Sequence, residues 1–343
     1  MSRLLLHAPN IHTGGGLSLL RALLDIRPSP FAIAQLDERA RCRLTVPGEM
    51  KAHFVAKNLW SRLSAEWRLR RLCGIDDIVL CFSNLPPLFR IRGKSIVFVQ
   101  NRLLVERYAL AGYPLFVRAR ITMERLWLHA RRDQPSRYVV QSPSMALMLQ
   151  QSTGTRRPIS VLPFVAESTE TIVPDPHGRT ARRFDFIYAA SGDPHKNHAV
   201  LLEAWRLLAR SGLRPSLCLT VDPIRYAALA SAIDAAVRQD ELDITNLGWL
   251  SASELAAAYS DSRALIYPSL IESFGLPLLE AARAKLPILA PERDYVRDVA
   301  NPAETFDPTS SLSIARAVKR HLRQSEDIGR VLSVSDFVAD ILS

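Results

Sequence analysis

The fold is decided by residues 267–280, which read YPSLIESFGLPLLE. An apolar strand ends at Tyr267 or Pro268, and a short loop with one glycine follows it. Pro277 then stands in the first turn of a helix, where its missing N–H costs little. Strand, tight loop and helix in this order form the unit of a parallel α/β sheet. We therefore expect this helix to begin beside the carboxyl end of a strand.

The start of this helix predicts an anion-binding site with a carboxylate on each side. The first N–H groups of a helix have no partner inside it, so the backbone from Phe274 to Leu278 would present free donors. Glu272 precedes the helix, and Glu280 lies about one turn inside it. A ligand with a phosphate centre and hydroxyl groups on both sides suits this arrangement, and a nucleotide sugar is such a ligand. Two surface acids on a structural turn are the alternative.

Strands and helices alternate on both sides of this stretch. From residue 184 onward we expect strands at 184–190, 216–221, 244–247, 264–268 and 287–290. We expect helices between them at 199–210, 224–237, 251–259 and 276–284, and closing helices at 311–323 and 334–342. Strands that alternate with helices at this spacing predict a parallel sheet.

The first half of the chain has the same alternation. An apolar run at 4–8 leads to a glycine turn at 14–16 and a helical run at 17–24. Further strands are expected at 78–82, 95–100, 137–141 and 159–165, with a helix at 145–150. Residues 166–183 are polar and contain two prolines and a glycine, which indicates a linker. We therefore predict two Rossmann-like, doubly wound parallel-sheet domains facing a cleft, at 1–165 and 184–330, with a final helix at 331–343 that packs back toward the first domain.

The run ESFGLPLLE at 272–280 resembles the E-x7-E motif of the retaining glycosyltransferases of family 4, also called glycosyl transferases group 1. The resemblance implies the two-domain GT-B fold. It also implies that Glu272 is the catalytic carboxylate beside the transferred sugar and that Glu280 binds the ribose hydroxyls of the donor. The residues between them that would also contact the donor are Ser273, Phe274, Gly275 and Leu276.

A second segment, YAASGDPHKN at 188–197, has a lysine just before a helix. A compact ammonium group beside a helix N-terminus suits a diphosphate. The segment resembles the family pattern G-R-L-D-P-x-K-N, whose Arg and Lys both hold the diphosphate. Lys196 matches the lysine and would act in catalysis by neutralising the leaving group, whereas Ser191 stands where the family has arginine. This departure implies weaker donor binding or a different arginine in that place. A solvated lysine on a turn is the alternative.

Three further segments resemble the family less closely. The segment NLGWL at 246–250 resembles the one that lines the base pocket, which would place Gly248 and Trp249 at the donor. The glycine loop after the first strand resembles the family loop whose backbone approaches donor or acceptor, and a tight turn alone is its other interpretation. Many members have a histidine near the strand end at 97–102, where this chain has glutamine and asparagine. The acceptor-side residues are thus expected to be Gly14, Gly15, Gly16, Gln100 and Asn101.

The positive charge of the chain is concentrated in its first half. Residues 1–165 contain 25 of the 44 Lys and Arg but only 10 of the 34 Asp and Glu, a net charge of +15, so the remainder has 19 against 24, or −5. This distribution favours an anionic partner, such as a phosphorylated acceptor or a membrane surface. The basic helical runs at 57–72 and 113–132 fit either an anionic bilayer or an ordinary solvated face. No recognition motif accompanies the charge, so we expect no nucleic-acid partner.

Several classes of protein are disfavoured by what the sequence lacks. The four cysteines form no CxxC pair and no zinc-like spacing, which is typical of reduced cysteines in a cytosolic protein. No stretch approaches the ~20 apolar residues that span a bilayer. We expect a cytoplasmic protein, either free or peripheral on the inner face of the cytoplasmic membrane. No DxD sequence lies at a strand end, so we expect a metal-independent reaction with no cofactor, in which the nucleotide sugar is a substrate.

The resemblance implies a glycosyltransferase. It would move a hexose, with retention, from a nucleoside diphosphate sugar to a glycan or lipid-linked acceptor in the synthesis of cell-surface polysaccharide or lipopolysaccharide. A nucleotide-sugar epimerase of the same fold is one alternative, and it requires acid and base carboxylates on the N-terminal side. A nucleotide-sugar-binding scaffold without catalysis is the other, and Ser191 keeps it open. The sequence does not identify the nucleotide base of the donor, the transferred sugar or the acceptor.

Overall fold

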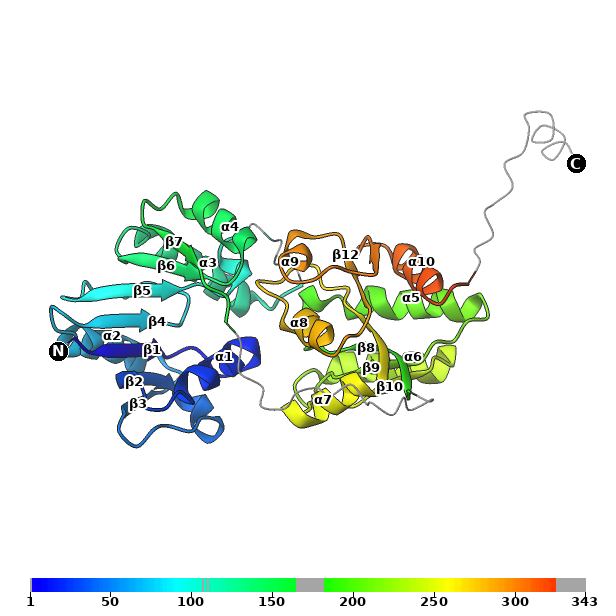
Figure 1. Ribbon diagram of the computed structural model, residues 1–343, viewed down its shortest axis with the longest axis horizontal. Helices are drawn as coiled ribbons and strands as arrows, with labels where there is room; N and C mark the ends of the chain where they lie inside the picture. The colour runs from blue at the N-terminus through cyan, green and yellow to red at the C-terminus, as the bar shows by residue number, and fades with distance from the viewer. Residues whose placement is uncertain (1, 107, 109, 111, 165–181, 325–343) are drawn as a thin grey trace, which may run out of the picture.

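The computed structural model describes residues 2–106, 108, 110, 112–164 and 182–324. These residues form two α/β domains that lie side by side, the first at the left and the second at the right of Figure 1. Each domain is built on a sheet in which every strand pairing is parallel. The predicted fold class is thereby confirmed.

The first sheet has seven strands in the order β3-β2-β1-β4-β5-β6-β7. Its strands are β1 (Leu4–Ala8), β2 (Phe31–Asp37), β3 (Lys51–Val55), β4 (Ile78–Cys81), β5 (Lys94–Phe98), β6 (Arg137–Val140) and β7 (Ile159–Val161). Helix α1 (Gly14–Leu24) packs on one face of the sheet. Helices α2 (Leu59–Leu72), α3 (Leu115–Ala130) and α4 (Pro143–Thr153) pack together on the other. Two short 3-10 helices, η1 (Glu38–Arg43) and η2 (Arg102–Leu104), follow strands β2 and β5.

The second sheet has six strands in the order β10-β9-β8-β11-β12-β13. Its strands are β8 (Phe184–Tyr188), β9 (Leu217–Leu219), β10 (Ile244–Asn246), β11 (Ser262–Ile266), β12 (Ile288–Pro291) and β13 (Glu304–Phe306). The helices are η3 (Pro194–Lys196), α5 (His198–Arg210), α6 (Ala227–Asp240), α7 (Ala252–Ser260), α8 (Leu276–Arg283), α9 (Asp294–Arg297) and α10 (Ser311–His321). One apolar core joins this sheet to its helices, and Trp205 and Phe186 lie at its centre, ring edge against ring face.

Three strands and several helix starts differ from the expected pattern. The sequence patterns above did not predict β2, β3 or β13. Two of these, β3 and β13, are edge strands with several half-exposed residues, so the alternation that marks a strand is weak there. Helix α1 begins at Gly14 rather than Leu17, because the glycines that were expected to form a turn make its first turn. The expected linker lies outside the described residues except for Arg182 and Arg183, and the expected helix at 331–343 lies wholly outside them.

The carboxyl ends of the two sheets face the boundary between the domains. Helix α1, which follows β1, lies opposite α8, which follows β11 (Figure 1). The two helices meet there, since a Cβ atom added to Gly15 would lie 3.1 Å from Leu276 Cδ1. The loops at this boundary are therefore where the predicted site residues can meet.

Among the helices of the described residues, none has the length and apolar composition that crossing a membrane requires.

Candidate active site

The backbone at the start of α8 depends on a glycine. Gly275 has φ +75° and ψ +57°, the left-handed conformation that L residues rarely adopt. A Cβ atom there would also lie 2.9 Å from Leu278 Cδ1. The Leu278 N–H donates to the Gly275 carbonyl at 2.9 Å, so the predicted row of free donors was too long. Within the described chain, Phe274, Gly275 and Leu276 keep N–H groups without an acceptor, and Pro277 has none to offer.

Lys196 and Glu272 form an ion pair at the end of the second sheet. Lys196 Nζ donates to Glu272 Oε1, and the Tyr267 hydroxyl donates to the same oxygen at 2.7 Å. The two charged side chains are only 14% and 11% exposed. Burial alone would raise the pKa of Glu272, but Lys196 and then His195 outweigh it, and the pKa is lowered. The candidate catalytic carboxylate is thus held in its charged form.

Buried tyrosines fix the backbone of the two loops that carry this pair. The Tyr188 hydroxyl donates to the Lys196 carbonyl at 2.6 Å, and the Tyr295 hydroxyl donates to the Ser269 carbonyl at 2.6 Å. Asn197 joins the same loops, because its side-chain amide donates to the carbonyls of Pro268 and Pro308 at 3.2 and 2.6 Å. Both loops are therefore anchored through main-chain oxygens.

Glu280 lies in a different environment from Glu272. Its side chain accepts one hydrogen bond, from the Tyr259 hydroxyl at 3.0 Å. Burial raises its pKa, and the Tyr259 hydrogen bond and the nearby Arg283 only partly oppose this rise. The carboxyl group at this position therefore lacks the charge compensation that Glu272 receives.

In the loop after β8, Ser191 stands at the position that corresponds to the arginine of the resembling family pattern. The Ser191 hydroxyl donates to Asp193 Oδ2 at 2.7 Å, and His198 Nε2 lies 2.9 Å from the Ser191 carbonyl. Gly192 lies against Tyr226, since a Cβ atom at this position would be 2.5 Å from the ring. The guanidinium of Arg225 lies over the same ring, 5.1 Å from its centre. Ser191 is thus engaged within its own loop.

The segment expected at the base pocket forms a glycine turn. Gly248 has φ +75°, and Asn246 Oδ1 accepts from the N–H groups of Val221 and Gly248 at 2.9 and 3.3 Å. The Trp249 ring is exposed to solvent. The turn is therefore fixed by its own side chains, with Trp249 projecting outward.

On the first domain, the glycines and Gln100 lie together at the boundary. A Cβ atom on Gly16 would lie 3.2 Å from the Gln100 side chain, whose amide donates to the Phe82 carbonyl at 3.2 Å. Gly14 has φ +67° and precedes the Gly15 contact with Leu276. Asn101 follows Gln100, and its side-chain oxygen accepts from the Leu103 N–H at 3.1 Å and caps η2.

Two first-domain residues that the sequence patterns did not single out reach the second domain. Arg102 is buried and donates through Nη1 to the Glu272 carbonyl at 3.0 Å, while its Nη2 lies 3.2 Å from Asp294 Oδ1. The Tyr113 hydroxyl lies 2.6 Å from His195 Nδ1. Burial and then Lys196 lower the pKa of that histidine. Arg102 and Tyr113 therefore brace the two loops that hold the Lys196–Glu272 pair.

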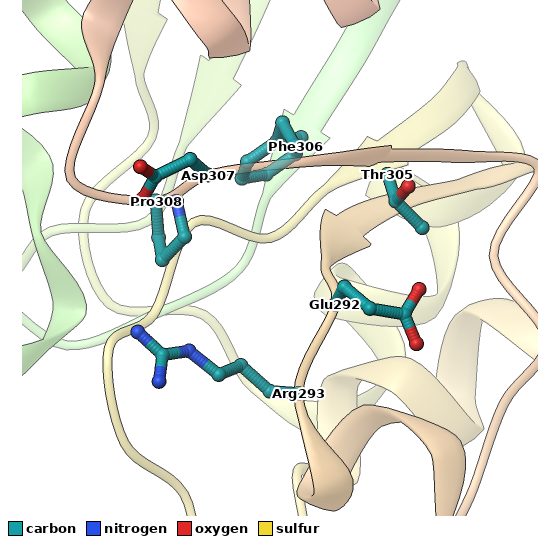
Figure 2. Close-up of a pocket in the computed structure, with 6 residues that line it drawn as sticks. All are labelled: Glu292, Arg293, Thr305, Phe306, Asp307 and Pro308. Atoms are coloured by element: carbon teal, nitrogen blue, oxygen red, sulfur yellow. The ribbon is translucent and has the colours of Figure 1, made fainter.

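A hollow of about 410 Å³ lies at the ends of β12 and β13, and Pro308, whose carbonyl accepts from Asn197, is part of its lining. Figure 2 shows the Arg293 side chain extending toward Asp307 and Pro308, while Glu292 points to the other side. None of the residues predicted for the site lines it. Across the described part of the chain, no three His, Cys, Asp or Glu side chains gather in a way that could hold a metal ion.

The sequence of the second domain matches a known family. Residues 171–330 match the family described as glycosyl transferases group 1. The match covers slightly less than half of the chain, and this part of the sequence is similar to that family. The family's E-x7-E motif therefore coincides with the residues that the structure places around the start of α8.

Two proteins of Escherichia coli are similar over part of this chain. The serotype-specific mannosyltransferase WbdA is 33% identical over 141 residues, which cover 40% of this chain and 17% of WbdA. The O-antigen chain mannosyltransferase B is 27% identical over 141 residues, 40% of this chain and 36% of that protein. The alignment thus spans well under half the length of either relative.

Solved structures resemble the chain over nearly its whole length. Sucrose-phosphate synthase from Thermosynechococcus elongatus has a TM-score of 0.70 at 15% identity, covering 94% of this chain and 90% of that one. Anabaena HepE, in complex with UDP and glucose, has a TM-score of 0.65 at 12% identity with the same coverage. These similarities confirm the GT-B fold.

Proposed function

We propose that this protein is a retaining, metal-independent glycosyltransferase that moves a hexose from a nucleoside diphosphate sugar. The observation that carries the proposal is the Lys196–Glu272 pair beside the start of α8. It combines a cation, a charged carboxylate and unpaired backbone donors at one sheet edge, within a family of glycosyl transferases. The sugar and diphosphate found with HepE support a donor of this class.

In the proposed reaction, the second domain stabilises the departing diphosphate. Lys196 has three donors, so it can keep its contact with Glu272 and also donate to the phosphate oxygens, and the N–H groups of Phe274, Gly275 and Leu276 supply further donors. Glu272, held charged by its surroundings, faces the sugar as positive charge develops at its anomeric carbon. These groups act without a metal, because a cation and a helix start together neutralise the leaving group. Ser191 contributes a hydroxyl where the family has arginine.

The remaining predicted residues divide between donor and acceptor. Glu280 accepts hydrogen bonds from the ribose hydroxyls, Ser273 lies beside the sugar, and the turn at Gly248 and Trp249 lies beside the base. From the first domain, the residues that contact the acceptor are Gly14, Gly15, Gly16, Gln100 and Asn101.

The acceptor we propose is a growing glycan or a lipid-linked saccharide of cell-surface polysaccharide or lipopolysaccharide synthesis. The two similar mannosyltransferases, one named for O-antigen chains, support this class. The +15 net charge of residues 1–165 suits a phosphorylated acceptor and a location at the inner face of the cytoplasmic membrane. No nucleic acid takes part.

A thermal-shift panel tests the proposal directly. GDP, UDP, ADP, dTDP and CMP are each added to the wild type and to Lys196→Ala, with EDTA present throughout. A ligand that binds only the folded state raises its melting temperature. We expect one nucleoside diphosphate to stabilise the wild type without metal and to lose that effect in Lys196→Ala, while Lys319→Ala, on the distant helix α10, keeps it.

Each of the following results would contradict the proposal. If no nucleotide shifts the melting temperature, or if a shift requires a divalent metal, the site does not work as described. If a nucleotide binds but no acceptor mixture supports sugar transfer, the protein is a binding scaffold. Release of the free epimeric nucleotide sugar instead of a glycoside identifies an epimerase.

A further inference from the structure

Helix α3 has apolar residues on two opposite faces. Its inner face contributes Ile121 and Leu128 to the core of the first domain, where both are almost fully buried. Its outer face presents Leu115, Phe116 and Leu126, which are 77%, 75% and 67% exposed. Packing against the sheet accounts for the apolar residues of the inner face. It does not account for the apolar residues of the outer face, which are exposed.

The exposed residues form one stripe along the helix. Residues three or four positions apart lie on the same side of an α-helix. Leu115, Ala119, Met123, Leu126 and Ala130 follow this spacing, and all five are exposed. A stripe that runs the full length of a sixteen-residue helix is a continuous apolar surface rather than a set of scattered side chains.

Helix α2 also has exposed apolar residues. It packs on the same face of the sheet as α3, since Leu69 shares a core with Ile121 and Leu128. The outward sides of α2 and α3 therefore lie on the same side of the domain. On α2 that side presents Trp60 and Trp67, seven residues apart and both exposed. The Arg71 guanidinium covers the Trp67 ring at 3.9 Å.

Exposed arginines flank the apolar stripe. On a helical projection, Arg118 lies on one side of the stripe of α3 and Arg120 on the other. Arg131 follows at the end of the helix and is also exposed. An apolar stripe with arginines on both sides has the form of a helix that lies in the interface of an anionic bilayer.

We infer that the outer faces of α2 and α3 are a membrane-docking surface for anionic lipid. A second copy of the chain is the other occupant that an apolar face could have, but it would bring two surfaces of the same positive charge together. Anionic headgroups complement the arginines, and acyl chains complement the stripe. The inference does not depend on the transfer reaction proposed above, because lipid binding is measured without donor or acceptor.

Vesicle flotation of the full chain tests the inference. The vesicles contain phosphatidylcholine alone or phosphatidylcholine with phosphatidylglycerol. We expect the wild type to float with the anionic vesicles and to lose binding as salt is raised. The double variant Phe116→Ser, Leu126→Ser should bind at least about ten-fold more weakly, since two apolar side chains leave the bilayer. Leu312→Ser, an exposed leucine on α10 of the second domain, is the matched control and should bind as the wild type does.

A second pair of variants separates charge from apolar contact. Arg118→Gln should weaken binding to anionic vesicles about five-fold and leave any binding to neutral vesicles unchanged. Arg238→Gln, an exposed arginine on α6, should change neither. Circular-dichroism melting confirms that each variant is folded. The inference is overturned if the wild type binds neither vesicle, if the double variant binds equally well, or if sedimentation shows a dimer that the double variant abolishes.

Discussion

Glu272 and Glu280 lie eight residues apart in one motif, but their surroundings differ. Glu272 receives an ion pair from Lys196 and a hydrogen bond from Tyr267, and its pKa is lowered. Glu280 receives one hydrogen bond from Tyr259, and burial raises its pKa. The protein therefore gives one carboxylate a direct ion pair and compensates the other only partly.

This contrast suggests different contributions to stability and function. A carboxylate that is paired before the ligand arrives keeps its charge, and it can act on charge that develops during the reaction. A carboxylate buried without a cation costs folding energy, and accepting hydrogen bonds from a ligand offsets that cost. Spacing in the sequence does not separate these roles, whereas the contacts of each side chain do.

The largest effect is expected from Glu272→Gln. This variant keeps the shape of the side chain but removes the charge that we propose faces the sugar, so we expect the turnover rate to fall by about 10³-fold. Steady-state transfer assays with the donor identified by thermal shift measure this. Glu292→Gln, an exposed carboxylate paired with Arg297, is the control and should retain activity. Turnover within about two-fold of the wild type would remove Glu272 from its proposed role.

Arg102→Ala should have the next largest effect. Arg102 touches the Glu272 backbone rather than its carboxylate, so its loss should displace the loop and lower turnover by ten-fold to about a hundred-fold. Nucleotide affinity measured by titration calorimetry should change little, because the second domain keeps its own contacts. Arg102→Lys should recover part of the rate. An equal loss of nucleotide affinity and turnover would instead indicate a general structural role.

Glu280→Gln should act on the donor rather than on the chemical step. Replacing a charged acceptor of ribose hydrogen bonds should raise the donor KM about ten-fold, with kcat within about two-fold. Initial rates at varied donor concentration give both constants. Should kcat fall as far as it does in Glu272→Gln, the distinction between the two carboxylates would be wrong.

The smallest expected effect is on the melting temperature of Glu280→Gln, and it depends on pH. Because the folded protein raises the pKa of Glu280 above its ordinary 4.5, the folded state holds this proton more tightly than the unfolded chain. Stability therefore falls as pH rises from 4.5 through the raised pKa, and the full cost is present above that pKa. Glu280→Gln should melt about 2 °C higher than the wild type at pH 7 and equally at pH 4. A lower melting temperature at pH 7 would show that the carboxylate is compensated after all.

The local parts of the site were predictable from sequence. Gly275 and Pro277 mark a strand-to-helix turn because each acts on its own backbone, and the structure has that turn where the pattern placed it. The start of α1 was misplaced because a glycine run is compatible with either a turn or a helix start. The continuous apolar run of β2 was overlooked although it is typical of a buried strand.

Contacts between the domains were beyond sequence reasoning. Arg102 lies 170 residues from the Glu272 carbonyl that it binds, and nothing local distinguishes it from other arginines of the basic first half. Nor does sequence periodicity show that the outer face of α3 stays exposed, because a helix with two apolar faces is equally consistent with full burial. Only the packing of α3 against the sheet decides which face is covered.

The tyrosine contacts described above have a consequence for how such a site can diversify. Tyr188 and Tyr295 bind the carbonyl oxygens of Lys196 and Ser269, groups that every amino acid provides. Substitution at position 196 therefore leaves the Tyr188 anchor in place, whereas substitution of the buried Ser269 would also remove the hydrogen bonds from its hydroxyl to the carbonyls of His195 and Ile271. The side chain at position 196 can thus change while the backbone that carries it keeps its anchor, whereas position 269 is constrained in both side chain and backbone.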